Sequence, residues 1–335
     1  MSDREDVLSP SLGVAPARAT LRGHLAIARV DHWVKNVFVL PGIVVAIGMD
    51  TEPIGWSLVP RMLLGLLATC LVASSNYVIN EVLDAPYDRT HPVKRLRPVP
   101  SGQVSVPLAY VQWILLGVVG VALGLRVNWM FALTLLALWV MGCVYNIPPV
   151  RSKELPYLDV ISEALNNPIR MLAGWFIVEP AVLPPASLLV SYWMVGCYFM
   201  AIKRYSELRY MLSKEQAVHY RKSFAYYTTD RLLVSIVFYG SAAMLCFGAF
   251  IVRYRAELLL AFPLVALVMA VYLQIGFQEE GAAQAPEKLY KEPLLMGAVI
   301  SCTLVMAFLL LVDVPFMREL IAPTMPEAVQ TPPTP

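Results

Sequence analysis

Residues 80–88 read Asn-Glu-Val-Leu-Asp-Ala-Pro-Tyr-Asp, and residues 89–98 continue as Arg-Thr-His-Pro-Val-Lys-Arg-Leu-Arg-Pro. Three carboxylates and a carboxamide thus stand at the end of a long apolar run, directly before a cluster of cations. Glu81, Asp84 and Asp88 are spaced three and four residues apart, so a helix brings them to one face, where they repel unless a cation lies between them. Because this density of charge is costly at the edge of a membrane, it indicates a functional site.

The same stretch has the residue types of a metal–diphosphate site. Proteins hold Mg²⁺ through one or two carboxylates together with substrate phosphate oxygens, and cations bind the remaining phosphate oxygens. The predicted metal ligands are Asn80, Glu81, Asp84 and Asp88, and the predicted diphosphate ligands are Lys94, Arg95 and Arg97. The alternative is a solvated helix end with surface ion pairs. It does not explain why Asn76 and Asn80 lie one helical turn apart in an otherwise apolar segment.

The composition predicts an all-α, polytopic membrane helical bundle. The chain has 335 residues, of which 58% are hydrophobic and 15% are charged, and its mean hydropathy is +0.62. Apolar runs long enough to cross a bilayer recur along it. The nine predicted transmembrane spans are 34–49, 58–83, 105–124, 128–147, 156–178, 185–203, 232–252, 257–276 and 293–312. Basic segments do not alternate with aromatic residues, so no nucleic-acid partner is expected.

The charges fall mainly on one side of this topology. Twenty of the 26 Lys and Arg residues lie on the side that carries the N-terminus. By the positive-inside rule this side is the cytoplasm. We therefore expect a cytoplasmic tail over 1–30, one transmembrane domain over 31–315 and a disordered tail over 316–335. The expected location is the inner, cytoplasmic membrane, with the active site facing the cytoplasm.

A second polar group follows the fourth span. Residues 145–153 read Tyr-Asn-Ile-Pro-Pro-Val-Arg-Ser-Lys, and the two prolines predict a rigid loop that carries Arg151 and Lys153. The fifth span then carries polar residues at 4-3-4 spacing, and Pro168 predicts a kink or break within it. These residues are Asp159, Glu163, Asn166 and Arg170. A polar stripe of this kind lines a protein interior; the alternative is an internal Asp–Arg pair that only stabilises the fold.

A third group joins spans six and seven. The long connection is basic, and connections of this length in a compact bundle are usually functional. We predict a lid that contacts phosphates through Lys203, Arg204, Arg221 and Lys222. The alternative is a basic loop attracted to anionic lipid head groups.

These motifs resemble the UbiA superfamily of intramembrane prenyltransferases. The string from Tyr145 to Lys153 is similar to that superfamily's Y-S-x-x-P-x-R-x-K loop. Other strings resemble the decaprenyl-phosphate phosphoribosyltransferase branch: Trp-Val-Lys-Asn at 33–36, His-Pro-Val-Lys-Arg-Leu-Arg-Pro at 91–98, Lys-Arg-Tyr-Ser-Glu at 203–207 and Arg-Lys-Ser at 221–223. Glu81 stands where that branch usually has Asp.

The resemblance implies a Mg²⁺-dependent membrane transferase whose leaving group is diphosphate. The expected reaction moves 5-phosphoribose from phosphoribosyl diphosphate to a polyprenyl phosphate; the alternative moves an isoprenyl chain from a polyprenyl diphosphate to an aromatic or other apolar acceptor. A lipid transporter or scaffold is a third hypothesis, but it predicts polar sites at the membrane midplane. The expected partners are a polyprenyl lipid, a diphosphate donor and membrane lipids; a homo-oligomer stays open.

Roles for individual residues follow from the same resemblance. The predicted catalytic residues are Asp84, Asp88, Asp159 and Lys94, of which Asp159 either binds a second metal or orients the acceptor. The predicted substrate-binding residues are Lys35, Asn80, Arg95, Arg97, Tyr145, Arg151, Lys153, Asn166, Arg170, Lys203, Arg204, Arg221 and Lys222.

Overall fold

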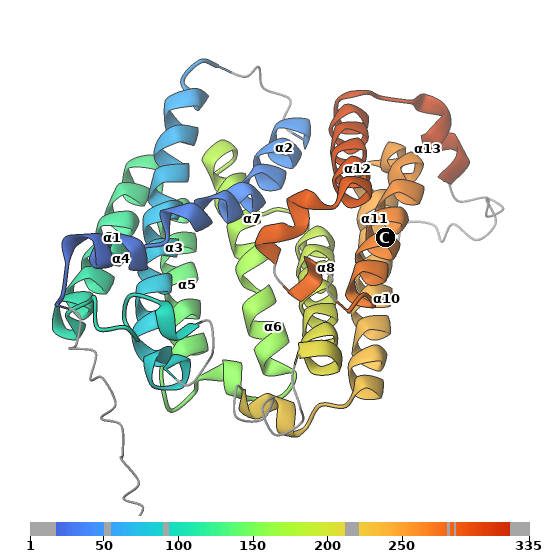
Figure 1. The fold of residues 1–335 in the computed structure, drawn as a ribbon. Coiled ribbons are helices and arrows are strands. Elements are labelled where there is room, and N and C mark those ends of the chain that lie inside the picture. Colours follow the sequence, from blue (N-terminus) through green and yellow to red (C-terminus); the bar gives the residue numbers. More distant parts are fainter. Residues whose placement is uncertain are drawn as a thin grey trace, which may run out of the picture.

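The computed structural model describes residues 18–49, 55–89, 94–211, 221–279, 282–284 and 286–321. These residues form helices and connecting segments, without a strand among them. Eight helical segments are long and apolar enough to cross a membrane. The predicted all-α membrane bundle is therefore confirmed (Figure 1).

The elements follow one another with short connections. The first half of the chain contains α1 (Leu21–Ile27), η1 (Val30–Val39), α2 (Leu40–Met49), α3 (Leu58–Asp88), η2 (Lys94–Leu96), α4 (Val106–Val127) and α5 (Trp129–Asn146). The middle contains η3 (Ser152–Glu154), α6 (Leu158–Ala164), α7 (Asn166–Val178), α8 (Ala186–Ser206) and η4 (Glu207–Met211). The remainder contains η5 (Lys222–Ala225), α10 (Thr229–Tyr254), η6 (Ala256–Ala261), α11 (Phe262–Gly276), η7 (Ala282–Gln284), η8 (Pro286–Lys291), α12 (Pro293–Leu311) and α13 (Pro315–Ile321).

The fifth predicted span is broken, as its proline indicated. It consists of the short helix α6 and the longer helix α7, which meet at Leu165. The break lies three residues before Pro168, because a proline is tolerated in the first turn of a helix and Pro168 occupies that turn of α7. The other eight predicted spans each coincide with one of the eight long helical segments.

Three boundaries differ from the prediction. Helix α3 extends beyond the predicted span 58–83, through Pro86 to Asp88, so the acidic residues lie on a helix as their spacing predicted. Within the predicted N-terminal tail, residues 21–27 form α1, and residues 1–17 lie outside the described residues. The predicted C-terminal tail begins with α13, and residues 322–335 also lie outside them. Hydropathy missed α1 and α13 because each has only seven residues.

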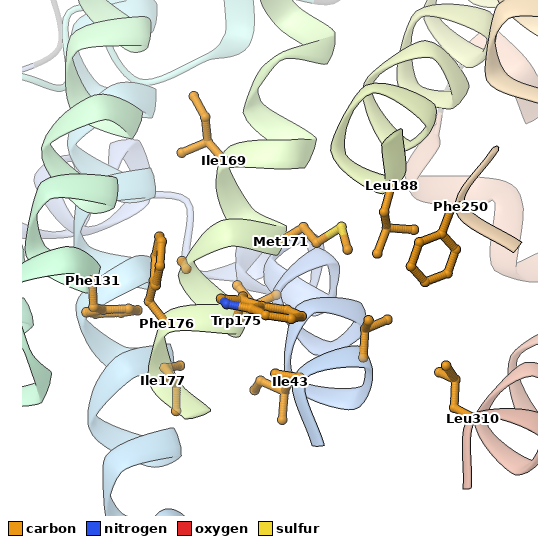
Figure 2. Packing of buried hydrophobic residues seen from close by; sticks show 14 of the residues in the cluster. Ile43, Phe131, Ile169, Met171, Trp175, Phe176, Ile177, Leu188, Phe250 and Leu310 are labelled. Atoms are coloured by element: carbon orange, nitrogen blue, oxygen red, sulfur yellow. The ribbon is translucent and has the colours of Figure 1, made fainter. Parts of the chain in front are cut away.

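Helices α6 and α7 run through the middle of the bundle. Figure 1 shows them between α3, α4 and α5 on one side and α8, α10, α11 and α12 on the other. Apolar side chains of α7 form the centre of the largest buried cluster. Figure 2 shows Met171 and Trp175 of α7 between Phe131 of α5 and Phe250 of α10. The polar face of α6 and α7 is thereby held at a fixed place between the two helix groups.

Glycines let α7 approach the N-terminal elements closely. A Cβ atom on Gly174 would lie 1.9 Å from the carbonyl oxygen of Val39, and one on Gly42 would lie 1.9 Å from that of Met171. Small residues allow such backbone contact between membrane helices. The contact holds η1 and α2 against α7. It therefore also fixes the polar residues of η1 relative to those of α7.

We expect Gly42→Ala and Gly174→Ala each to destabilise the fold by about 1–3 kcal/mol, because overpacking forces the backbones apart. The measurement is the melting temperature of the purified protein in detergent. Gly248→Ala and Gly297→Ala are matched controls, since nothing lies within 4 Å of a Cβ at either position. Equal melting temperatures in all four variants would contradict the close packing of α2 on α7.

Candidate active site

The ends of several helices meet at one end of the bundle, at the bottom of Figure 1. Helices α3, α5 and α8 end there and α6 begins there. The polar side chains on these ends form two groups of ion pairs, one around Asp84 and one around Asp159. Several of the residues predicted from the sequence belong to one of these groups.

The first group, the α3 carboxylate site, consists of Asp84, Asp88, Arg97, Arg151 and Lys153. Asp84 Oδ1 accepts from Arg151 Nη2 at 2.9 Å and from Lys153 Nζ at 2.5 Å. Asp88 Oδ2 accepts from Arg97 Nη1 at 2.7 Å. The acids of α3 therefore contact cations from both of the predicted basic segments, which lie far apart in the sequence.

Asn146, the last residue of α5, organises this site. Its Oδ1 accepts from Asn80 Nδ2 at 2.6 Å and from Lys153 Nζ at 2.8 Å. Its backbone oxygen accepts from Arg151 Nη1 at 3.1 Å, and Arg151 has a left-handed backbone with φ 32°. Asn146 was not among the site residues predicted from the sequence. Its place near the end of the fourth predicted span, two residues before Pro148, was the signal for a polar residue at the site.

Burial and neighbouring charges shift the pKa values of Lys153 and Glu154, which lie on η3. Lys153 is 5% exposed, and burial lowers the pKa of its ammonium group to about 8, although Asp84 acts in the opposite direction. Glu154 accepts from Arg151 Nε at 2.6 Å and from Lys222 Nζ at 2.7 Å. Burial raises the pKa of Glu154, but these hydrogen bonds outweigh it and leave the pKa below its usual value. Lys222 thus contacts the α3 carboxylate site through Glu154, which the sequence analysis had not selected.

Three oxygens on α3 are suited to a metal. In the part of the chain that the structure describes, Asp84 Oδ2, Asp88 Oδ1 and Asn80 Oδ1 accept no hydrogen bond. They stand at four-residue spacing on one face of α3. No three His, Cys, Asp or Glu side chains of the described residues converge. Two carboxylates and an amide fit Mg²⁺, which takes its other ligands from phosphate oxygens and water.

Glu81 does not belong to this ligand set, so that part of the prediction is wrong. It is 2% exposed, and its Oε1 accepts from the Val99 backbone N–H at 3.1 Å. Its Oε2 lies 3.5 Å from Arg29 Nη2. Both oxygens are engaged by partners from other segments, so Glu81 anchors the α1 and η2 connections to α3.

The second group, the Asp159 network, is buried. Asp159 is 0% exposed, and its Oδ1 accepts from the Tyr227 hydroxyl at 2.6 Å. Its Oδ2 accepts from Arg204 Nε at 3.0 Å and Ser223 Oγ at 3.3 Å, and lies 3.6 Å from Arg221 Nη1. With both oxygens engaged, the geometry disfavours a second metal at Asp159 and favours a positioning role. Ser223 and Tyr227 are distant from Asp159 in the sequence and lie beside it only in the folded chain, so sequence spacing did not reveal them.

Arg204 is part of this network and not of a phosphate-binding lid. It lies within α8, is 1% exposed and pairs with Glu207 at 2.7 Å and with Glu163 at 3.6 Å, in addition to Asp159. Three carboxylates therefore occupy its guanidinium group, which corrects the predicted phosphate contact. Lys203 next to it is partly exposed. Residues 212–220 of the predicted lid lie outside the described residues.

Tyr145 and Arg221 connect the two groups. The Tyr145 hydroxyl donates a short hydrogen bond to Glu163. Arg221 Nη1 lies 3.3 Å from the Tyr145 hydroxyl and 3.3 Å from the backbone oxygen of Lys153. A displacement of Arg221 would therefore change the surroundings of both Lys153 and Asp159.

The remaining predicted residues lie on other elements or make other contacts. Arg170 donates to Asn36 Oδ1 at 3.1 Å, deeper along α7, and Asn166 donates to the Glu163 backbone oxygen at 3.0 Å. Lys35 lies on η1, and Lys94 and Arg95 lie on η2. The residues His91, Pro92 and Val93 of the basic string lie outside the described residues.

We expect Arg204→Met to lower the stability of the protein by about 3–5 kcal/mol, because it leaves Asp159 and Glu207 buried without their main cation. Lys203→Met is the matched control and should stay within about 0.5 kcal/mol, as surface changes do. Unfolding in detergent with increasing denaturant measures both. Equal stability of the two variants would contradict the structural role of Arg204.

Known proteins resemble this chain over most of its length. Residues 37–299 match the UbiA prenyltransferase family. The decaprenyl-phosphate phosphoribosyltransferase of Mycolicibacterium smegmatis is 29% identical over 234 residues, which cover 70% of this chain and 71% of that protein. The enzyme of the same name from Mycobacterium tuberculosis is 28% identical over 242 residues, covering 72% and 78%.

The fold is also that of a solved structure. A UbiA homologue from Archaeoglobus fulgidus, bound to GPP and Mg²⁺, superimposes with a TM-score of 0.66 at 21% identity, covering 86% of this chain and 99% of that one. The match to the family model spans well over half of the chain. The chain, a multi-pass membrane transferase, therefore belongs to the UbiA prenyltransferase family.

Proposed function

We propose that this protein transfers 5-phosphoribose from phosphoribosyl diphosphate to a polyprenyl phosphate, with Mg²⁺ and with its active site at the cytoplasmic face of the inner membrane. The observation that carries the proposal is the α3 carboxylate site. Its two acids are paired with three cations, yet each acid keeps one oxygen that accepts no hydrogen bond among the described residues. Such a site can take a metal and a diphosphate together, with little change in net charge.

The phosphoribosyl reaction suits the side chains of this site. The acceptor phosphate is already anionic and needs no base to remove a proton before it attacks. The sequence relatives with the widest coverage given above carry the name of that activity. The cationic end of the bundle also suits a donor that bears phosphate at both ends.

The chemistry is a substitution at C1 of the ribose. The bond between C1 and the diphosphate oxygen breaks, the diphosphate leaves with the electron pair, and an oxygen of the lipid phosphate forms the new bond to C1. Arg151 and Lys153 would hold the diphosphate and stabilise the charge that develops on it. Asn80, Asp84 and Asp88 would hold Mg²⁺, which when bound neutralises the leaving group.

The Asp159 network would support this reaction by positioning a segment that contacts the α3 carboxylate site. Asp159 and Tyr227 hold the segment before α10, and Arg221 in that segment reaches the backbone oxygen of Lys153. In this proposal Asp159 is a positioning residue. Lys94, Arg95 and Arg97 would bind the rest of the donor at the η2 side of the site.

The second candidate is prenyl transfer from a polyprenyl diphosphate to an apolar acceptor. It is favoured by the solved structures of the same fold, because those of the Archaeoglobus fulgidus homologue hold GPP or DMAPP with Mg²⁺. In this reaction the lipid is the donor and the same α3 carboxylate site would hold its diphosphate. The two candidates therefore differ in which substrate carries the lipid.

A parallel assay of two donors in nanodiscs separates the candidates. One reaction contains radiolabelled phosphoribosyl diphosphate with a polyprenyl phosphate, and the other contains a radiolabelled polyprenyl diphosphate with aromatic acceptors. We expect Mg²⁺-dependent entry of label into the organic phase in the first reaction only, because the acceptor there is the lipid. Labelled aromatic product in the second reaction alone would overturn the phosphoribosyl proposal.

We expect Asp84→Asn and Asp88→Asn each to lower kcat by at least about 100-fold, the scale on which one electrostatic contact to a developing charge acts. Each variant loses ion pairs, so the melting temperature should fall, but an amide still accepts a hydrogen bond from Arg151 or Arg97 and the fold should be kept. Asp230→Asn is the matched control, since Asp230 is exposed on the first turn of α10. Activity of the Asp84 or Asp88 variant within a fewfold of the control would refute the proposed metal site.

A further inference from the structure

Arg170 is a cation inside the bundle, and no acidic side chain of the described residues pairs with it. Its Nε donates to Asn36 Oδ1 at 3.1 Å, and its Nη1 lies 3.4 Å from the backbone oxygen of Asn166. Among the described residues it forms no ion pair, whereas Arg151 and Arg204 each pair with carboxylates. A charge within a transmembrane segment is costly and calls for a counter-charge.

The guanidinium group of Arg170 still has donors to offer. An arginine carries five N–H groups, and the two hydrogen bonds above use one each. The remaining N–H groups are enough for a bidentate contact with a phosphate. Arg170 is partly exposed, so these groups are reachable.

Two tyrosines stand near this cation. They are Tyr77 of α3 and Tyr192 of α8, and both pack against η1, whose Asn36 contacts Arg170. The ring of Tyr77 lies 5.4 Å from that of His32, and the ring of Tyr192 lies 6.3 Å from that of Phe38, so both contact η1. In the described part of the chain neither tyrosine hydroxyl makes a hydrogen bond, so both can donate to an anion.

The helix η1, which contacts Arg170 through Asn36, is itself unusual. Asn36 lies on η1, a 3₁₀ helix of ten residues, and such helices rarely exceed four. Asn36 is 2% exposed, and its Nδ2 donates to Cys70 Sγ at 3.1 Å. On the outer side of η1, Val34 is 74% and Val37 52% exposed. One side of η1 thus meets the cation while the other offers an apolar surface to lipid.

The depth of Arg170 separates it from the α3 carboxylate site. Arg170 contacts Asn36, which donates to Cys70 in the middle of α3, whereas Asp84 and Asp88 lie at the C-terminal end of that helix. A water-soluble donor meets the charged rim first, whereas a lipid phosphate enters beside its own apolar tail. A cation deeper in the bundle and behind an apolar surface matches the lipid.

We propose that Arg170, held by Asn36 and flanked by Tyr77 and Tyr192, binds the phosphate head group of the polyprenyl phosphate. This inference rests on the proposed function and adds to it the place of the acceptor. The isoprenoid tail leaves past η1, towards Val34 and Val37. The acceptor phosphate and the donor diphosphate then occupy different cations of one active site.

The test measures lipid binding without any turnover. Undecaprenyl phosphate, with undecaprenol as its neutral analogue, is titrated into the full chain in detergent, without donor or Mg²⁺, and native mass spectrometry reads the bound fraction. We expect Arg170→Gln to weaken binding of the phosphate at least tenfold and to leave undecaprenol binding unchanged. Arg61→Gln, at the opposite end of α3, is the matched control with unchanged binding of both lipids.

Asn36→Asp distinguishes an anion site from a structural contact. The new carboxylate keeps the acceptor for Arg170 but neutralises its charge. If Arg170 serves to bind phosphate, this variant melts at or above the temperature of the unaltered protein and binds undecaprenyl phosphate at least tenfold more weakly. If Arg170 only fastens η1 to α7, binding stays unchanged, and the proposal is overturned.

The outcome separates this proposal from the proposed function. In the transfer assay, Asn36→Asp should raise the KM for the lipid phosphate at least tenfold and leave the KM for phosphoribosyl diphosphate within twofold. An increase confined to the donor KM would assign Arg170 to the donor and overturn the proposal. If phosphoribose transfer is absent while Arg170→Gln and Asn36→Asp both lose lipid-phosphate binding, the proposed function fails and the anion site stands.

Discussion

A charged side chain buried in a membrane protein is not solvated by bulk water, so it needs an oppositely charged or hydrogen-bonding partner nearby. The arrangement of this bundle follows from that constraint. Asp84 is partnered by Arg151 and Lys153 of a distant segment, and Asp159 is partnered by Arg204. Each pair ties together helices that the sequence separates. Removing one member of a buried pair is destabilising because the other charge is left unpaired.

Helices α6 and α7 show the same constraint along one segment. Three of their polar residues meet partners from three different elements: Asp159 meets α8, Glu163 meets α5 and Arg170 meets η1. These contacts hold α6 and α7, which meet at Leu165, while apolar residues of α7 remain in the core.

The sequence predicted the fold well because its signal is apolar length, and eight of the nine predicted spans are continuous helical segments. It also predicted that Asp84 and Asp88 lie near cations, since helical spacing and the basic loops were both visible. It placed Glu81 wrongly, because Val99 and Arg29, the partners of Glu81, come from segments whose approach only the fold determines. Arg204 was misassigned for a related reason. A cation at the end of a span looks the same in sequence whether it faces water or three carboxylates.

The ion pairs of the α3 carboxylate site also suggest how substrate binding and stability are reconciled. An active site rich in cations would repel itself before substrate arrives, yet here Arg97, Arg151 and Lys153 each contact an acid of α3. When diphosphate and metal arrive together, the cations can turn to the phosphate and the acids to the metal. Every charge then exchanges one partner for another, so the net charge of the site changes little. Arg170 lacks such a partner among the described residues, and the proposed lipid phosphate would supply its counter-charge.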